Sequence, residues 1–524
     1  MKHIHGRRMR FLLYAFYVAL IASSNGCLED DQDGKHQQDG DGTDSSDSDR
    51  VPVDPWLLGG SADPCQDSIS SIYEDPGDLP GEKGAIIRCA EDQNFSSDAL
   101  YHYMNENGYK GVPFTSGTTT YRILYRTERG NGEAGYASAK LFLPTRPRAQ
   151  TLPVVISLRG SVGLAPQCAA SKHDHEERYG DFERQNFSLA GYGYAVLATD
   201  LAGFANYGAP GNPPFGYAHT SDMGKPALDG VIAMRNLLGD KLSRKVVLLG
   251  QSQGGHSALS ALAMSNPVNE NVTAKNEALG LEHYGVDGEI AGVALYAPLW
   301  FSQRSWGGLL QLAGMYPFAT SSLLNMASIW YHYSHGEILD GEGHGLDIFK
   351  DEVKEGVKEL VDTTCSALRT PALEELGKNM RDIVEPSFYS AIAAAAAMTG
   401  DCKGNALCEK WMARYYADRP HIAGSASQAP ILIVYSMSDT TIGPGRMACV
   451  FDRLKEDGVP LEVCIDDNDA GHGGTMDVRG DFVADWIASK TLDADIPSKC
   501  EMGFQNFVGD KGEAIVCATP PPND

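Results

Sequence analysis

The pentapeptide GQSQG at Gly250–Gly254 constrains this chain more than any other feature of its sequence. It follows the apolar run Val246–Leu249 and precedes His256–Ala263, a stretch rich in small residues. A G-x-S-x-G pattern between a strand and a helix holds the serine on a sharp, strained turn, and the glycines leave room for the adjoining strand and helix. We therefore predict that Ser252 is a nucleophile at the end of a buried strand. The alternative is a glycine-rich turn without a chemical role.

Strand-like and helix-like segments alternate along the chain, which predicts an α/β fold with a mostly parallel central sheet and helices on both faces. Continuous apolar runs are typical of strands buried on both faces. Such runs are Pro153–Ser157, Tyr194–Ala198, Val246–Leu249, Ile290–Leu295 and Ile431–Tyr435. Further strands are expected at Tyr121–Tyr125, Ala137–Leu143 and Leu461–Ile465, the first two around a turn at Arg129–Gly132.

The segment at about 300–425 is expected to be a helical insertion between two strands. Helices are expected at Ser302–Trp330, Ile348–Val361 and Ser387–Met398. The apolar side chains between Trp306 and Trp330 need a surface to pack against. The insertion is therefore either a lid that lines a pocket for an acyl group or a helical subdomain with its own core.

Asp439 is the candidate acid of a catalytic triad. A serine hydroxyl is a weak nucleophile until a histidine removes its proton and a carboxylate orients that histidine. On this kind of sheet the partners follow in the order Ser, Asp, His. Asp439 comes shortly after the apolar strand Ile431–Tyr435 and before Pro444. The alternative is an ordinary turn aspartate.

His472 is the candidate general base, because it is the only histidine after Asp439. It stands in the glycine-rich run Ala470–Gly474, which we expect to be a flexible loop. The neighbouring acids lie too close in sequence to His472 to occupy a separate strand end, and we expect them to be solvated. These acids are Asp466, Asp467 and Asp469. The other histidines considered as bases are His173, His175, His256, His332 and His335.

Two backbone N–H groups are expected to bind the oxyanion that forms during acyl transfer. The first is the N–H of Gln253, at the positive end of the following helix. The second is expected from the loop Ser157–Gly163, whose glycines let the backbone turn inward. Either Ser161 or Val162 would donate there. The alternative is a plain loop at the end of a strand.

Residues 1–26 predict an export signal. Basic residues precede the apolar run Phe11–Ala22, which is shorter than the roughly 20 residues of a membrane-spanning helix. Two cleavage sites compete. Ala22–Ser24 suits an ordinary signal peptidase, whereas Gly26-Cys27 resembles a bacterial lipoprotein site at which the cysteine is acylated. Cys27 has a second explanation as one more disulfide cysteine.

Residues 27–55 are expected to form an acidic, disordered linker, and residues 56–524 the folded domain with its insertion. The linker is rich in Asp, Gly and Ser and lacks aromatic residues, so it cannot build a core. Like charges keep such a segment extended. A linker of this kind could tether the folded domain to an acylated Cys27.

Charge and cysteine usage narrow the classes of partner and compartment. The net charge of −26 argues against nucleic acid as a partner. The chain has 11 cysteines, and export would place them where disulfides persist. Local candidate pairs are Cys402–Cys408, Cys449–Cys464 and Cys500–Cys517. No spacing of cysteine and histidine indicates zinc, and Asp39-x-Asp41 lacks the closing acid of a calcium loop, so no metal is expected.

Several motifs, in the same order, resemble the secretory lipase family, whose lipase A type members are α/β-hydrolases with a helical lid. The motifs are Pro80–Arg88, Tyr121–Tyr125, Arg159–Gly163 with Cys168–Ser171, Gly193–Asp200 and Leu228-Asp229. The resemblance covers about residues 65–490. Arg159 stands where the family has histidine, and Ala170 where it has proline. The resemblance implies an α/β-hydrolase fold and ester hydrolysis through Ser252, Asp439 and His472.

These observations together predict an exported serine hydrolase that cleaves small-molecule or lipid esters through an acyl-enzyme, without a cofactor. It would be either secreted or held at a bacterial outer membrane by an acylated Cys27. A peptidase or polymer esterase is the alternative within enzymes, because fold and triad do not choose the acyl group. A non-catalytic, surface-anchored binding protein is the alternative from another class. The sequence does not indicate an oligomeric state.

Overall fold

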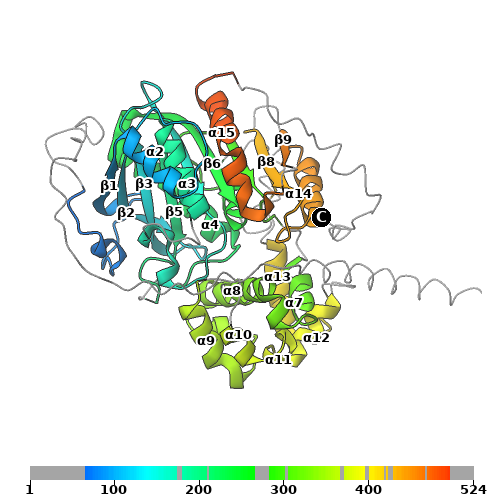
Figure 1. Ribbon diagram of the computed structural model, residues 1–524. Helices are drawn as coiled ribbons and strands as arrows, with labels where there is room; N and C mark the ends of the chain where they lie inside the picture. The colour runs from blue at the N-terminus through cyan, green and yellow to red at the C-terminus, as the bar shows by residue number, and fades with distance from the viewer. Residues whose placement is uncertain are drawn as a thin grey trace, which may run out of the picture. The chain divides into compact units, whose positions relative to one another are not determined.

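One nine-stranded sheet with helices on both faces organises the described part of the chain (Figure 1). The computed structural model describes residues 65–173, 180–208, 212–265, 283–300, 305–365, 371–395, 401–417, 421–422, 429–466 and 469–495. All of them belong to the unit Val51–Asp524. The predicted α/β fold, with a mostly parallel sheet and helices on both faces, is confirmed.

The strands pair in the order β1-β2-β3-β5-β4-β6-β7-β8-β9. Their bounds are β1 (Ile86–Phe95), β2 (Thr118–Glu128), β3 (Ala134–Pro144), β4 (Leu152–Leu158), β5 (Ala195–Ala202), β6 (Leu242–Gln251), β7 (Glu289–Tyr296), β8 (Ile431–Ser436) and β9 (Leu461–Asp466). From β1 to β5 the neighbours are antiparallel, and from β5 onward they are parallel. The segments that follow β4, β6, β8 and β9 therefore leave the sheet at the same edge.

The predicted strands are present, and β1 is an additional strand that the sequence pattern did not indicate. Its residues Ile86–Phe95 include charged side chains, and most of them are only half-buried. A strand at the edge of a sheet has a partner on one side only, so its sequence lacks the continuous apolar run of an inner strand.

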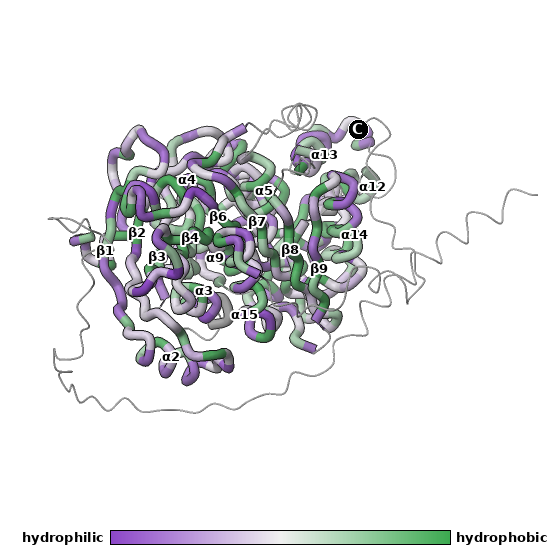
Figure 2. Tube along the Cα trace, turned by 90° about the horizontal axis from the view of Figure 1, so that it is seen from above, coloured by the Kyte–Doolittle hydropathy of each residue, from purple (hydrophilic) through white to green (hydrophobic). Residues whose placement is uncertain are grey.

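Helices cover both faces of the sheet. They are α2 (Ser97–Glu106), α3 (Gly180–Gly191), α4 (Thr220–Leu238), α5 (Gln253–Ser265), α14 (Pro444–Glu456) and α15 (Gly471–Thr491). On one face, Val155, Val247 and Leu432 pack with apolar residues of α3 and α15. On the other face, residues next to them in the strands, such as Val154 and Leu248, pack with residues of α4, α5 and α14. The inner strands are accordingly the apolar centre of the tube in Figure 2.

The segment between β7 and β8 forms helices that lie together below the sheet in Figure 1. They are α7 (Ser305–Ala313), α8 (Ser322–Leu339), α9 (Lys354–Thr363), α10 (Pro371–Leu376), α11 (Met380–Ile383), α12 (Pro386–Ala394) and α13 (Ala406–Ala417). Among the described residues, short 3₁₀ helices are Ser70–Tyr73, Pro166–Cys168, Ala170–Lys172, Gly239–Lys241, Phe318–Thr320, His344–Leu346 and Asp351–Val353.

The segment Ser302–Trp330, which was expected to be helical, is interrupted once. The segment contains two helices, α7 and α8, with Pro317 between them. Proline disfavours helical backbone in the residue before it and has no N–H to donate. α7 ends at Ala313, Pro317 prevents helical backbone from continuing through the connection, and a short 3₁₀ turn leads into α8.

Aromatic and histidine side chains fill the interior of the insertion. The rings of Trp306 and Tyr331 stack with centroids 4.1 Å apart. His332 is fully buried and contacts the Ser328 carbonyl at 2.6 Å and the Tyr415 hydroxyl at 2.7 Å. Burial lowers the pKa of His332 to about 4. The interior of the insertion thus keeps an imidazole neutral, and its apolar residues belong to the same core cluster as those on one face of the sheet.

Stability is expected to fall on mild acidification. Burial also lowers the pKa of His219 to about 4 and that of His256 to about 3. Below the usual histidine pKa of about 6.5 the unfolded chain binds more protons than the folded one, so stability falls from there down to the folded pKa. We expect the Tm at about pH 5 to lie about 5 °C below the Tm at about pH 7. Calorimetry at the two pH values would measure this difference.

Two variants test the origin of this pH dependence. His332→Gln removes one buried imidazole and is expected to narrow the difference in Tm between the two pH values. His102→Gln is the matched control, because the His102 side chain is 78% exposed, and it should leave the difference unchanged. An equal Tm at both pH values in the wild type would contradict the assignment.

Disulfides among the described residues join Cys65 to Cys89, Cys168 to Cys365 and Cys402 to Cys408. The predicted Cys402–Cys408 pair is confirmed. The other two bridges were not predicted, because their partners are 24 and 197 residues apart. Cys449 and Cys464 are each disulfide-bonded, and the predicted Cys500–Cys517 pair lies outside the described residues. The bridges indicate an exported protein, since disulfides persist in oxidising compartments.

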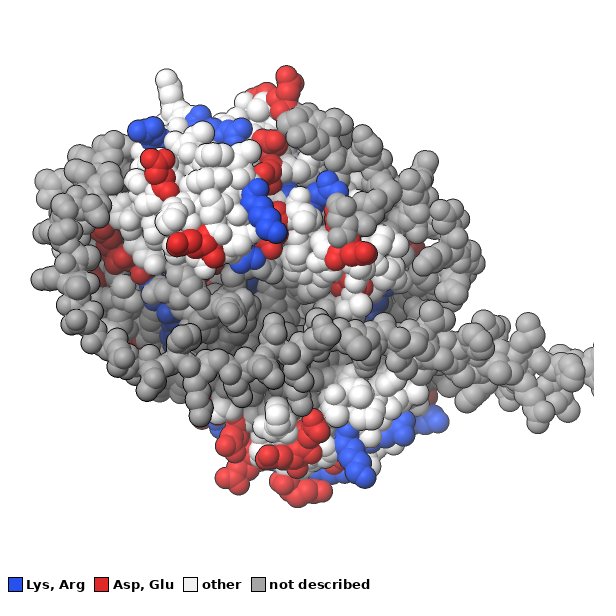
Figure 3. Space-filling view, viewed as in Figure 1, with Lys and Arg blue, Asp and Glu red and all other residues white. Residues whose placement is uncertain are grey.

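The surface of the insertion carries many carboxylates. Asp and Glu side chains gather over the region of α9 and α10 in Figure 3. The exposed acids of this region are Asp351, Glu352, Glu355, Glu359, Glu374, Glu375 and Asp382.

Within the described residues, no helix is long and apolar enough to cross a lipid bilayer. Cys27 and the predicted signal and linker lie outside the described residues.

Candidate functional site

Ser252 lies on the sharp turn between β6 and α5, as predicted. Its φ is +53°, in the left-handed region that non-glycine residues seldom adopt. The turn is held from both sides, because the Ser252 N–H donates to the Tyr296 carbonyl at 2.9 Å and the Ser252 carbonyl accepts from the Leu299 N–H at 2.8 Å. Backbone strain that the surrounding structure maintains in this way is typical of functional positions.

Gly254 allows the turn to pack closely on the neighbouring strand. A Cβ atom at Gly254 would lie 1.9 Å from the Leu158 carbonyl oxygen and 2.6 Å from that of Arg159. Both contacts are with backbone, which cannot move aside as a side chain can. The second glycine of the G-x-S-x-G pattern is therefore required by the distance between β4 and the start of α5.

Gly254→Ala is expected to destabilise the fold by at least about 2 kcal/mol, since the added methyl group must push two backbone segments apart. Chemical denaturation would measure the change in the free energy of unfolding. Gly308→Ala is the matched control, because a Cβ at Gly308 in α7 meets no atom within 4 Å. Alanine is the better helix former, so the control should be neutral or slightly stabilising. Equal stability of both variants would contradict this account of the turn.

The loop after β4, in which the second oxyanion donor was predicted, lies beside Ser252. A Cβ at Gly160 would lie 2.2 Å from Gln251 Oε1 and 3.3 Å from Ser252 Cβ. Ser161 is half-buried and Val162 is buried. Gly160, the residue before the two predicted donors, is thus packed against the turn that carries Ser252, and the assignment of a donor stays a prediction.

Asp439 follows β8 and contacts His472 directly. His472 Nδ1 and Asp439 Oδ2 are 2.7 Å apart. The other carboxylate oxygen, Oδ1, accepts from the N–H groups of Thr441 at 2.8 Å and Ile442 at 2.9 Å. The Asp439 side chain has no exposed surface, whereas that of His472 is 21% exposed. Two backbone donors thus fix a buried carboxylate against a partly exposed imidazole.

His472 lies in the first turn of helix α15, so the predicted flexible glycine loop is wrong. Gly471 has a φ of +67° and begins the helix, which continues to Thr491. Glycine disfavours helix, but packing of the apolar side of a helix can outweigh its low propensity. Here Trp486 and Ile487 anchor α15 in the core.

The expectation that the acids near His472 are solvated is wrong for Asp466. Asp466 ends β9 with a fully buried side chain and accepts hydrogen bonds from Arg479 at 3.0 and 3.2 Å. A buried carboxylate requires such a charged partner. Asp469 is exposed as expected, and Asp467 lies outside the described residues.

The other histidines considered as bases lie elsewhere. His256 is buried in α5 beside Trp300, with ring centroids 5.2 Å apart. His332 and His335 belong to the interior of the insertion. His173 contacts the Gln167 carbonyl at 2.7 Å, and His175 lies outside the described residues. Among the described residues, no group of three or more His, Cys, Asp or Glu could hold a metal ion.

Residues 175–486 match the alpha/beta hydrolase family in sequence, which is more than half of the chain. The chain belongs to the alpha/beta hydrolase family. No curated protein matches it in sequence. The finer resemblance of this alpha/beta hydrolase to the secretory lipase family stays a prediction.

Solved structures share the fold of this alpha/beta hydrolase at low sequence identity. A presumed hydrolase of Legionella pneumophila has a TM-score of 0.56 at 15% identity, over 77% of this chain and 98% of its own. The rice cell wall degrading esterase LipA of Xanthomonas oryzae has a TM-score of 0.54 at 16% identity, over 79% and 99%. Candida antarctica lipase A has a TM-score of 0.54 at 15% identity, over 80% and 84%. The predicted α/β-hydrolase fold class is confirmed.

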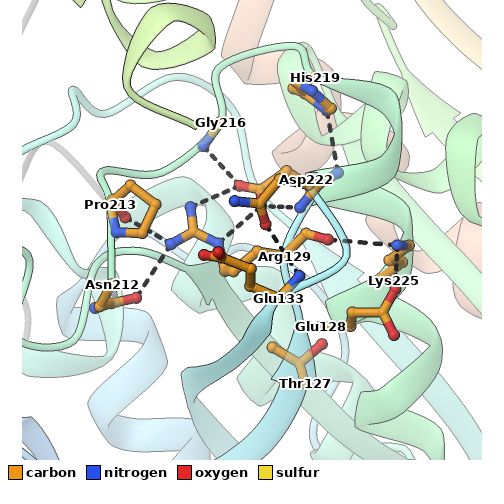
Figure 4. Close-up of polar contacts among 12 residues, drawn as sticks. Thr127, Glu128, Arg129, Glu133, Asn212, Pro213, Gly216, His219, Asp222 and Lys225 are labelled. Atoms are coloured by element: carbon orange, nitrogen blue, oxygen red, sulfur yellow. Dashed lines mark hydrogen bonds and ion pairs between the residues drawn. The ribbon is translucent and has the colours of Figure 1, made fainter. Parts of the chain in front are cut away.

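Figure 4 shows a buried ion pair of this alpha/beta hydrolase, between Arg129 and Asp222, that the sequence pattern did not indicate. Arg129 Nε donates to Asp222 Oδ1 at 2.8 Å, and Arg129 Nη2 donates to Oδ2 at 3.0 Å. Neither side chain has exposed surface. Burial raises the pKa of Asp222, but the Arg129 guanidinium outweighs it and holds the pKa below its usual value. Arg129 was visible in the sequence only as a turn residue.

Proposed function

We propose that this alpha/beta hydrolase cleaves carboxylic esters through an acyl-enzyme formed on Ser252. The observation that carries the proposal is the strained turn of Ser252 at the same sheet edge as the 2.7 Å contact between His472 and Asp439. Ser252 would attack the ester carbonyl, His472 would accept its proton, and Asp439 would orient the imidazole.

The contacts of Asp439 support these roles. With His472 Nδ1 donating to Asp439, the Nε2 atom is the ring nitrogen left to accept a proton. Asp439 remains a carboxylate acceptor for two backbone N–H groups, and it would stabilise the imidazolium formed during attack. His472 would then return the proton to the leaving alcohol, and water would hydrolyse the acyl-enzyme by the same path.

The oxyanion of each tetrahedral intermediate would be bound by backbone N–H groups of Gln253 and of Ser161 or Val162. This assignment is supported by the position of Gln253 at the start of α5 and by the close approach of Gly160 to Ser252. Donors held in place before the reaction need no reorganisation as charge develops, which makes them effective.

The proposal extends to export and to the insertion. We propose that the chain is secreted or anchored through an acylated Cys27, with residues 1–26 as signal and 27–55 as linker. The helical insertion at about 300–425 would act as a lid over the site. The aromatic side chains that pack against one another inside the insertion equally support a helical subdomain.

A peptidase or polymer esterase is the second candidate, because a triad on this fold does not select the acyl group. Of the structural neighbours, one is described as a cell wall degrading esterase and one as a lipase. Hydrolysis rates for short-chain and long-chain p-nitrophenyl esters, peptide amides and acylated polysaccharide would separate these substrates. Preference for a peptide amide would overturn the ester assignment.

Labelling with a fluorophosphonate probe tests the proposal, because such probes react with an activated serine. The purified wild type should be labelled and Ser252→Ala should not. Ser257→Ala is the matched control, because its buried hydroxyl lies in α5 and has no hydrogen-bond partner among the described residues. It should be labelled like the wild type. Labelling of Ser252→Ala would assign the nucleophile elsewhere, and no labelling of the folded wild type would favour a non-catalytic binding protein.

A further inference from the structure

Tyr217 contacts the proposed oxyanion loop from a distant part of the chain. Its hydroxyl lies 2.7 Å from Ser161 Oγ. The Tyr217 side chain is buried, and burial raises its pKa to about 12, so the phenol stays protonated at neutral pH. The contact therefore joins two neutral hydroxyls, one of which belongs to a residue proposed as an oxyanion donor.

The insertion holds Tyr217 by both backbone groups and by its ring. The Tyr217 N–H donates to Ser334 Oγ at 3.1 Å, and its carbonyl lies 3.2 Å from His335 Nε2; both partners belong to α8. The ring packs against Trp330 with centroids 5.4 Å apart and against Trp306 at 6.1 Å. Tyr217 thus connects the insertion to the loop after β4.

The buried ion pair fixes the segment that carries Tyr217 (Figure 4). Asp222 Oδ2 accepts from the Gly216 N–H at 2.9 Å. Arg129 donates to the carbonyls of Pro213 at 2.6 Å and Pro214 at 2.8 Å. Ala218, the next residue after Tyr217, has a φ of +52°. Strain of this kind persists only where surrounding contacts determine the backbone, so this segment is held in one conformation.

The loop after β4 is also tied to the insertion at its other end. The Cys168–Cys365 disulfide joins it to the segment that follows α9. Gln167 Nε2 donates to the Asp362 carbonyl at 2.9 Å. The loop is therefore anchored at Ser161 through Tyr217 and at Cys168 through the disulfide.

We propose that Tyr217 is a positioning residue for the oxyanion loop and that, through it, the insertion sets the geometry of the backbone donors near Ser161 and Val162. This inference rests on the proposed ester hydrolysis. Tyr217 does not act on the substrate. Its hydroxyl fixes the position of the Ser161 side chain through the contact at 2.7 Å. The Ser161 side chain in turn fixes the backbone whose N–H groups would bind the oxyanion.

Displacement of an oxyanion donor weakens binding of the transition state more than binding of the substrate. A misplacement of about 1 Å can lower the rate by about 100-fold. Loss of the Tyr217 hydroxyl should therefore act on kcat and leave KM nearly unchanged.

Tyr217→Phe tests the proposal, because it removes the hydroxyl and keeps the ring against Trp306 and Trp330. We expect kcat for a short-chain p-nitrophenyl ester to fall about 10-fold to 100-fold with little change in KM. Affinity for a boronic acid that mimics the tetrahedral intermediate should fall by a similar factor. Ser161→Ala should reproduce both effects, and the double variant should be no worse than either single variant.

Tyr333→Phe is the matched control. Its hydroxyl lies 3.1 Å from that of Tyr207 and also joins α8 to the segment after β5, without a contact to Ser161. It should keep the wild-type kcat and boronic acid affinity. Equal values for Tyr217→Phe and Tyr333→Phe, or an additive double variant, would overturn the inference. Should Tyr217→Phe fail to fold, a wild-type kcat for Ser161→Ala would overturn it.

Failure of the proposed function is distinguishable from failure of this inference. A wild type that neither hydrolyses the ester nor reacts with the fluorophosphonate probe would refute the function. A wild type that does both while Tyr217→Phe matches it would refute the positioning role alone.

Discussion

Ser252→Ala is expected to lower kcat for a short-chain ester by about 10⁴-fold or more, with the fold unchanged. The hydroxyl is the atom that would form the acyl-enzyme, and no other group of the turn can replace it. The proposed oxyanion donors and substrate contacts remain, so a small activity above the rate in water should persist. Steady-state hydrolysis of p-nitrophenyl butyrate would measure the loss, and circular dichroism would verify the fold.

Comparison with a His472 variant, and with the variant that combines both changes, sharpens this prediction. His472→Ala should lose activity comparably, because Ser252 then lacks a base, and combining both changes should add little. Ser257→Ala, which removes a buried hydroxyl of α5, the helix that follows Ser252, should retain wild-type kcat. Retention of more than about a tenth of the activity in Ser252→Ala would rule out its role as nucleophile.

Asp222→Ala is expected to reduce the free energy of unfolding by about 3–5 kcal/mol. The change leaves the Arg129 guanidinium buried without its anionic partner, since neither side chain has exposed surface. It also removes the acceptor for the N–H groups of Gly130 at 2.7 Å and Gly216 at 2.9 Å. Chemical denaturation of the oxidised, full-length protein would measure the loss.

Lys358→Ala is the control for Asp222→Ala. Lys358 pairs with Asp362 on α9, but its side chain is 54% exposed, and such pairs contribute less than about 1 kcal/mol. The control should therefore unfold close to the wild type. Similar denaturation curves for Asp222→Ala and Lys358→Ala would show that the buried pair is not a main support of the fold.

Sequence patterns predicted the scaffold because its signals are local. The inner parallel strands contain continuous apolar runs, and such runs indicate burial on both faces. The turn at Ser252 was visible because strand, G-x-S-x-G and helix follow one another directly. The order Ser, Asp, His then pointed to Asp439 and His472, whose side chains lie in contact.

The errors concern residues whose environment comes from elsewhere in the chain. His472 was placed in a loop because glycines surround it, yet the packing of Trp486 fourteen positions later keeps the segment helical. Asp466 was expected in solvent, yet Arg479 pairs with it in the core. In both cases local composition was outweighed by tertiary contacts.

Local patterns were therefore sufficient for the sheet, the serine turn and the order of the candidate triad, because backbone preference and hydrophobic period are properties of neighbouring residues. The contacts that hold the candidate site in place come instead from residues far apart in the sequence. The contact between Ser161 and Tyr217 joins residues 56 positions apart in the sequence. The ion pair of Arg129 and Asp222 spans 93 positions, and the disulfide of Cys168 and Cys365 spans 197. These contacts exist only once the sheet brings the ends of separate strands together, so no local pattern could indicate them.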